Sequence, residues 1–190
     1  MSDKEREKHL QNMSGILAYL GEDPKREGLE KTPARYLDSM KYFTRGYQET
    51  PKQIIAEALF KVDYNDMVIV RDIEFYSLCE HHLVPFYGRC HIGYIPNGRV
   101  VGLSKIPRIV EVFSRRLQVQ EQLTHEIGKA FEETLAPQGV GIVMEAYHLC
   151  MMMRGIEKQR AFTVTSSMLG CFRKQETRQE FMAHLRSPRP

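Results

Sequence analysis

The chain has 190 residues, which is enough for one domain with a sizeable hydrophobic core. The composition is ordinary for a soluble globular protein, with 42% hydrophobic and 27% charged residues. The formal net charge of +3 is too small to indicate binding to nucleic acid or to a membrane. The N-terminus is charged, and the apolar runs are well short of the roughly 20 residues of a membrane span. The sequence also has four cysteines but no secretory signal. We therefore predict a cytoplasmic protein whose thiols are reduced or bind metal.

The first third of the sequence predicts helices. Apolar residues recur at helical spacing between Leu10 and Leu20. Thr32-Pro33 and Thr50-Pro51 each combine a capping residue with a proline at the first helical position. We therefore predict an N-terminal helical region over residues 1–62 that serves packing or assembly and carries no chemistry.

Beyond this region the pattern changes to strands and helices, which we predict to form a catalytic domain over residues 63–186. Consecutive strands joined by short turns favour an antiparallel sheet with helices on one face, an α+β fold. The predicted strands are residues 68–76, 87–95, 99–101, 141–153 and 160–167, the predicted helices begin near Ser104, Val119 and Thr177, and residues 187–190 are predicted to be a disordered tail.

The stretch Cys79-Glu80-His81-His82 places a thiol, a carboxylate and two imidazoles on consecutive residues. Cys79 and His82 have the Cys-x-x-His spacing of a zinc site, because a short turn brings the two donor atoms together. A third ligand must come from elsewhere, and Cys150 is the candidate if both stretches are strands or strand ends of one sheet. Three protein ligands would leave one position open, which indicates catalysis rather than scaffolding.

Strand alternation in residues 147–154 would place His148, Cys150 and Arg154 on one face, so an imidazole, a thiolate and a guanidinium would lie in a row. His81 stands beside a ligand and is free to move protons, so we predict that it is catalytic. Cys90 and Cys171 have no such neighbours and are predicted to be plain thiols.

Ser104, Lys105 and Arg108 form a candidate anion site at the start of a predicted helix, where free backbone N–H groups and the helix dipole favour a phosphate. This signal is weak by itself, but a second basic group of residues begins at Arg154. Gln120-Glu121 stands at the start of the next predicted helix. Its carboxylate either stabilises the helix dipole or accepts two N–H donors from a nitrogen heterocycle.

Several of these motifs together resemble GTP cyclohydrolase I in its zinc-dependent form, because the cysteine ligands are present. The resemblance extends from Gly21 to Phe181. The motifs that carry it are residues 79–86, 91–96, 102–105, 118–121 and 148–155.

The resemblance implies the tunnelling fold, assembled as a toroidal homodecamer with active sites between subunits. It implies conversion of GTP and water to 7,8-dihydroneopterin triphosphate and formate, which is the first step of folate and pterin biosynthesis. It also implies a role for each site residue. Cys79, His82 and Cys150 would bind zinc, His81 and His148 would transfer protons, Ser104, Lys105, Arg108 and Arg154 would hold the triphosphate, and Gln120 and Glu121 would hold the guanine.

One departure from the family pattern is visible, since Leu117 stands where the family commonly has proline, and we expect it to loosen the turn between two helices. Two alternatives stay open. The chain could be a related tunnelling-fold enzyme acting on a pterin or a deazaguanine, although the triphosphate residues favour a nucleotide. It could also be an inactive zinc-stabilised assembly module, although such a site would need four protein ligands and the sequence offers three.

Overall fold

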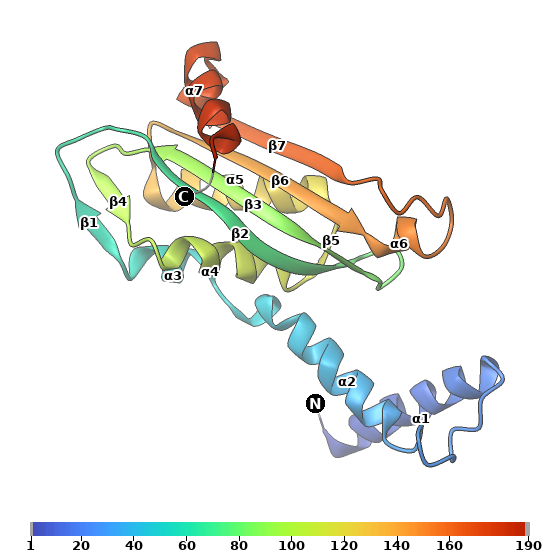
Figure 1. Ribbon diagram of the computed structural model, residues 1–190. Coiled ribbons are helices and arrows are strands. Elements are labelled where there is room, and N and C mark those ends of the chain that lie inside the picture. Colours follow the sequence, from blue (N-terminus) through green and yellow to red (C-terminus); the bar gives the residue numbers. More distant parts are fainter. Residues whose placement is uncertain (1, 189–190) are drawn as a thin grey trace. The chain divides into compact units, whose positions relative to one another are not determined.

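The computed structural model describes residues 2–188, and the chain divides into two compact units, one ending at Thr44 and one beginning at Arg45 (Figure 1). The domain boundary that the sequence suggests after residue 62 stays a prediction. In the described part of the chain, no helix combines the length and the apolar character needed to span a bilayer.

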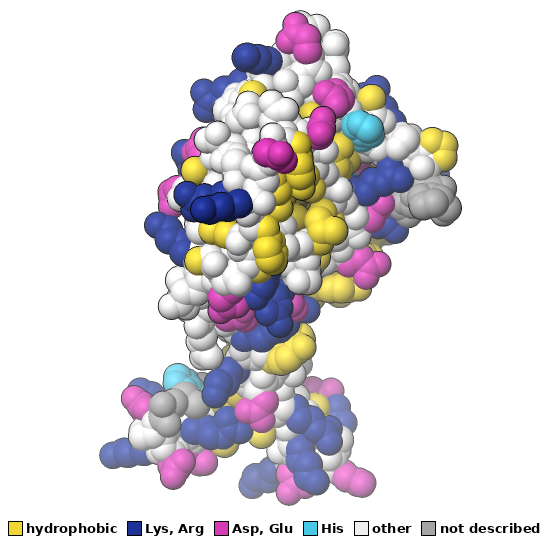
Figure 2. Space-filling model, turned by 90° about the vertical axis from the view of Figure 1, so that its left-hand side faces the viewer, with side chains coloured by type: hydrophobic (Ala, Val, Ile, Leu, Met, Phe, Trp, Pro, Cys, Tyr) yellow, Lys and Arg dark blue, Asp and Glu magenta, His cyan; other side chains and the backbone are white. Residues whose placement is uncertain are grey.

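The first unit is a pair of helices, α1 (Asp3–Tyr19) and α2 (Thr32–Phe43). Ser2 and Glu5 form a capping box that begins α1, and Pro33 lies in the first turn of α2. Leu17 is the buried apolar residue of α1, so the unit has a small core. Charged side chains of both signs gather on the face of this unit that Figure 2 shows.

The second unit is built on a five-stranded sheet with the order β5-β2-β3-β6-β7. The pairs β2–β3, β3–β6 and β6–β7 are antiparallel, whereas β5 runs parallel to the end of β2. The predicted α+β fold is therefore confirmed. The sheet strands are β2 (Val68–Cys79), β3 (Pro85–Ile95), β5 (Leu117–Gln118), β6 (Gly139–His148) and β7 (Thr163–Gly170), and a separate two-stranded sheet contains β1 (Leu59–Lys61) and β4 (Arg99–Val101).

The helices α4 and α5 cover one face of the sheet and bury the main hydrophobic core (Figure 1). Leu123, Ile127 and Phe131 of α5 recur at helical spacing and are fully buried there. The helices of this unit are α3 (Pro51–Ala56), α4 (Lys105–Ser114), α5 (Gln120–Leu135), α6 (Leu149–Met152) and α7 (Gln175–Arg186), with short 3-10 turns η1 (Arg45–Gln48) and η2 (Cys171–Arg173).

The opposite face of the sheet is partly covered by α7. A Cβ at Gly93 would lie 2.7 Å from Phe181, so the missing side chain lets this ring pack directly on the strand. The tail is predicted to be disordered from residue 187. In the structure the guanidinium of Arg71 donates hydrogen bonds to the backbone carbonyls of its first two residues, Ser187 and Pro188. Residues 189–190 lie outside the described residues.

Several predicted elements differ from the structure in their ends, and the strand predicted over residues 160–167 spans Thr163–Gly170. The strand predicted through Met153 ends at His148, where the backbone is still extended, and the helical turn α6 follows. The helix predicted to begin near Ser104 spans Lys105–Ser114, and Leu117 and Gln118 after it form β5. The backbone N–H of Leu117 donates to the hydroxyl of Tyr47 (3.1 Å), a bond that proline in this position could not make.

Candidate metal centre and active site

The turn between β2 and β3 brings Cys79 and His82 together. The backbone N–H of Cys79 donates to the carbonyl of Val84, and the Cys79 carbonyl accepts from His82 and Leu83. Leu83 adopts a left-handed conformation with φ 54°, which reverses the chain within a few residues. As a result, the Sγ of Cys79 lies 3.7 Å from the Nδ1 of His82.

Cys150 reaches the same place from the other end of the sequence. The β3–β6 pairing sets Phe86 opposite His148, so the chain leaves β6 beside the point where β3 begins. The ligand atoms of Cys79, His82 and Cys150 all lie within 4.8 Å of one another, and this group can hold a metal ion. Both stretches are strand ends of one sheet, as expected, but the predicted row of His148, Cys150 and Arg154 on one strand face is wrong, because β6 ends at His148 and Cys150 lies on the helical turn α6.

The donor set fits a zinc ion. Tetrahedral zinc with ordinary bond lengths to sulfur and nitrogen separates these two ligand atoms by roughly 3.6 Å, close to the distance between Cys79 and His82. Burial raises the pKa of the Cys150 thiol, the nearby Cys79 sulfur raises it further, and the Arg154 guanidinium opposes the increase. Two adjacent sulfur donors are stabilised as thiolates by a bound divalent cation, and thiolate with imidazole is a donor set that suits zinc.

The two candidate catalytic histidines have different surroundings. His81 faces solvent, with 61% of its side chain exposed, and its Nδ1 lies 3.7 Å from the Sγ of Cys79. Its Nε2 lies 3.7 Å from the carboxylate of Glu80. A ring in this position can exchange protons with water.

His148 is half-buried and held on two sides. Its ring stacks on Phe86, with centroids 4.6 Å apart and planes within 4°. Its Nε2 lies 2.7 Å from Oε1 of Gln120. Burial lowers the pKa of His148, while the charge of Glu121 opposes this effect. The contact with Phe86 was not expected from the sequence, although Phe86 belongs to the motif that contains Cys79.

Gln120 and Glu121 begin α5 but differ in exposure. The side chain of Gln120 is buried, and both ends of its amide are engaged within the chain. Glu121 is exposed in the first turn of the helix. The carboxylate of Glu121 is therefore exposed to solvent, whereas the amide of Gln120 is held by other residues of the chain. The predicted contacts of both residues with a bound heterocycle stay predictions.

Of the predicted anion residues, Arg154 is close enough to act on the thiol of Cys150, but the structure does not bring Ser104, Lys105 or Arg108 to this cluster. Ser104 and Lys105 begin α4 at the end that follows β4, whereas Cys79 pairs with Gln118 beyond the other end of the helix. Ten residues of helix span about 15 Å, so these groups are far apart in one chain. The side chain of Ser104 makes no capping bond to α4, and Lys105 Nζ lies 2.6 Å from the carboxylate of Glu57.

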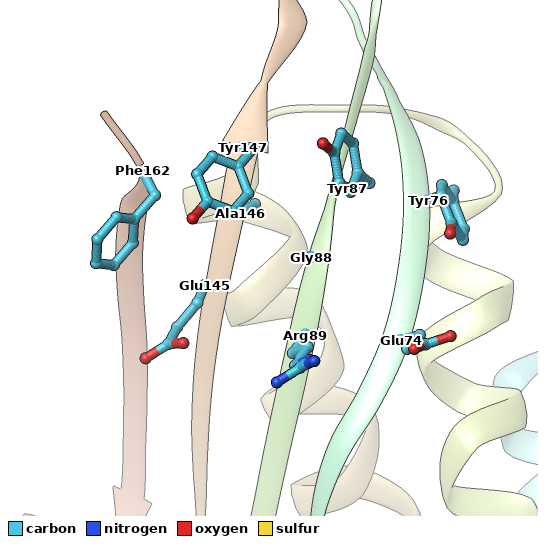
Figure 3. A pocket seen from close by; sticks show the side chains of 9 residues that line it. All are labelled: Glu74, Tyr76, Tyr87, Gly88, Arg89, Glu145, Ala146, Tyr147 and Phe162. Carbon is cyan, nitrogen blue, oxygen red and sulfur yellow. The ribbon is translucent and has the colours of Figure 1, made fainter. Parts of the chain in front are cut away.

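A pocket that the sequence did not predict lies on the open face of the sheet (Figure 3). Tyr76, Tyr87 and Tyr147 come from neighbouring strands in register, and Phe162 continues the row, with ring centroids about 6 Å apart. Tyr147 and its neighbour His148 point to opposite faces, so this pocket is separate from the metal centre. Glu74, Arg89 and Glu145 line the pocket beside the rings.

Comparison with known proteins gives the same result along almost the whole chain. Residues 9–186 match the model of the family described as GTP cyclohydrolase I. GTP cyclohydrolase 1 of Campylobacter concisus is 54% identical over 94% of this chain and 94% of its own length. The proteins of the same name from rat and human are 55% and 54% identical over 98% of this chain, which corresponds to 79% and 76% of their lengths. The chain belongs to the GTP cyclohydrolase I family.

Proposed function

We propose that this protein is a zinc-dependent GTP cyclohydrolase I, which converts GTP and water to 7,8-dihydroneopterin triphosphate and formate as the first step of folate and pterin biosynthesis. The observation that carries the proposal is the cluster of Cys79, His82 and Cys150. Three protein ligands leave a coordination position open, as catalytic zinc sites do. A structural zinc site would have a fourth protein ligand, and the described residues offer three in this group.

The first difficulty of the reaction is the attack of water on the imidazole carbon of an electron-rich guanine. When bound, zinc supplies a nucleophile at neutral pH by lowering the pKa of water to about 7. Cys79, His82 and Cys150 would hold it beside both candidate histidines. The attack also needs a proton on the adjacent ring nitrogen, which makes the carbon electrophilic, and an imidazole is suited to deliver it.

Later steps hydrolyse the formamide, open the ribose, rearrange it and close the pyrazine ring, and each needs a proton transfer. His81 is exposed and can exchange its proton with solvent, whereas the ring of His148 stacks on Phe86 and is partly buried. This difference supports a division of labour between the two rings. Each ring would transfer its proton to or from the part of the substrate to which it is hydrogen-bonded.

The remaining groups would bind the substrate. Glu121 would accept the two adjacent N–H donors of guanine, and Arg154, whose charge acts on Cys150, would meet the triphosphate. Ser104, Lys105 and Arg108 would complete the triphosphate site from a neighbouring copy, because α4 holds them away from the metal centre of their own chain. We therefore propose a homo-oligomer, a homodecamer by family resemblance.

The direct test is to incubate the purified, zinc-loaded protein with GTP. We expect equal amounts of formate and of a product that becomes a fluorescent pterin after oxidation. A related enzyme acting on a pterin or deazaguanine would leave GTP unchanged but convert its own heterocycle, and an inactive assembly module would convert neither. Absence of formate and pterin from a fully zinc-loaded sample would refute the proposed activity.

The oligomer can be tested by mass and by complementation. Light scattering should give a mass several times that of the 22.1 kDa chain. Lys105→Ala and Cys150→Ser should each be inactive alone. In mixed oligomers formed by co-expression, about a quarter of the sites should combine an intact Lys105 with an intact Cys150 and regain activity.

Complementation separates shared sites from sites within one chain. If each chain held a complete site, mixtures of the two variants would stay as inactive as either parent. An active monomer would likewise contradict sites shared between subunits. A mixture of Cys150→Ser with a second zinc-ligand variant, His82→Ala, serves as the control, because both changes affect the same chain's metal centre and should not complement.

A further inference from the structure

The amide of Gln120 is fixed by several neighbours at once. This side chain is only 1% exposed. Its Nε2 lies 3.2 Å from the carbonyl oxygen of Met144, 3.1 Å from that of Thr163 and 3.1 Å from Oγ1 of Thr165. Its Oε1 lies 2.7 Å from Nε2 of His148. The amide thus joins the start of α5 to β6, β7 and the candidate catalytic ring.

The direction of the bond between Gln120 and His148 follows from these partners. Backbone carbonyls can only accept hydrogen bonds, so the NH₂ end of the amide must face Met144 and Thr163. The other end is then an oxygen, which also can only accept. His148 must therefore donate, and its Nε2 carries a proton. In the neutral ring, which holds one proton, Nδ1 is left unprotonated.

Two further contacts make this arrangement rigid. The hydroxyl of Thr124 donates to the backbone carbonyl of Gln120 (2.7 Å) and lies 2.6 Å from the hydroxyl of Thr165. Thr165 therefore donates to Thr124 and is left to accept from the Gln120 amide, which closes a ring of hydrogen bonds. Phe86 fixes the plane of the imidazole by stacking, while Gln120 fixes its rotation within that plane.

We propose that Gln120 is a positioning residue, which holds His148 as the tautomer protonated on Nε2 and leaves Nδ1 as the nitrogen that accepts a proton. The inference rests on the proposed function for its kinetic consequence, since His148 is taken there to transfer protons during turnover. It gives the buried Gln120 side chain a role toward His148 instead of toward the guanine.

The tautomer can be read without substrate. Solid-state NMR of zinc-loaded protein containing ¹⁵N,¹³C-labelled histidine should show His148 with its proton on Nε2, the signals being assigned by their loss in His148→Asn. A neutral ring with its single proton on Nδ1 would overturn the inference whether or not the protein converts GTP. Conversely, failure of the wild-type protein to convert GTP would refute the proposed function and leave the tautomer result standing.

The kinetic test compares two replacements of Gln120 per folded, zinc-loaded site. Gln120→Met removes the acceptor, and we expect kcat to fall on the order of 10²-fold, with KM for GTP little changed, because a catalytic histidine without its orienting partner samples the wrong tautomer. Gln120→Glu keeps an acceptor for Nε2–H, so it should retain more of kcat than Gln120→Met.

A merely structural role predicts the opposite order. Neither replacement can donate to the carbonyls of Met144 and Thr163, but a buried carboxylate also places a negative charge against these oxygens and is therefore worse for stability than the neutral methionine. A kcat for Gln120→Glu at or below that of Gln120→Met would therefore count against positioning. Gln118→Met is the matched control, since Gln118 is also buried and its amide contacts Phe113 and Glu126 instead of His148, and its kcat should stay near wild type.

Discussion

Replacing Cys150 with serine should remove the metal and the turnover of GTP together. A serine hydroxyl stays protonated at neutral pH and is a poor zinc ligand, so Cys79 and His82 would be left with one partner too few. A Lewis acid is worth several kcal/mol of transition-state stabilisation, and its loss should reduce kcat/KM by on the order of 10³-fold or more. The measurement is metal content per chain alongside GTP turnover.

Cys171→Ser is the matched control. Cys171 lies on η2, is partly buried, and stands outside the group that can hold a metal, so its loss should change neither metal content nor turnover. Metal content should also fall as the pH drops, because protons compete for the thiolates, and the raised pKa of Cys150 makes that competition stronger. Full activity in metal-free protein would refute the zinc mechanism.

Glu121→Gln should weaken the use of GTP by on the order of 10²-fold in kcat/KM, about 3 kcal/mol. Guanine presents two adjacent N–H donors, on the ring and on the exocyclic amine, and one carboxylate can accept both. Glutamine keeps the size of the side chain but loses the charge and one acceptor. Adenine has no proton on the corresponding ring nitrogen, and its amine is on the other side of that nitrogen, so the wild-type carboxylate would lose both hydrogen bonds against ATP. Polar pairing of this kind can discriminate by about 10⁴-fold or more.

The same substitution at the other end of α5 provides a control. Glu133 is exposed and pairs weakly with Lys52 at 3.4 Å, so Glu133→Gln should leave kcat/KM for GTP unchanged. Zinc content should be normal in both variants. Near-normal GTP turnover by Glu121→Gln would mean that Glu121 only stabilises the start of the helix, and that the base is recognised by other residues.

Local patterns in the sequence were sufficient for most of the fold. The alternation from Val68 toward Cys79 predicts β2, and the helical spacing of Leu123, Ile127 and Phe131 predicts α5, because burial of one face imposes those periods. The Cys-x-x-His spacing predicts the proximity of Cys79 and His82 for a similarly local reason. A short turn fixes both donor atoms.

Features that depend on tertiary contacts could not be predicted in this way. Leu149 to Met153 contains neither glycine nor proline, so nothing in the sequence marks the end of β6 and the start of α6. The two-residue strand β5 exists because its backbone pairs with the end of β2. The distance between Lys105 and the metal centre follows from the direction of α4, which depends on packing against the sheet.

The pairing of β3 with β6 limits how the family can change in length. It runs without a shift from Ile95 opposite Gly139 to Phe86 opposite His148. One inserted residue within β6 would exchange the faces of Tyr147 and His148 and move the imidazole away from the metal ligands. The β2–β3 pair absorbs its irregularity between Val70 and Ile73, at the opposite end from Cys79. Insertions at the distant turns of this sheet would therefore leave the site in place, whereas an insertion within β6 would remove His148 from the metal ligands.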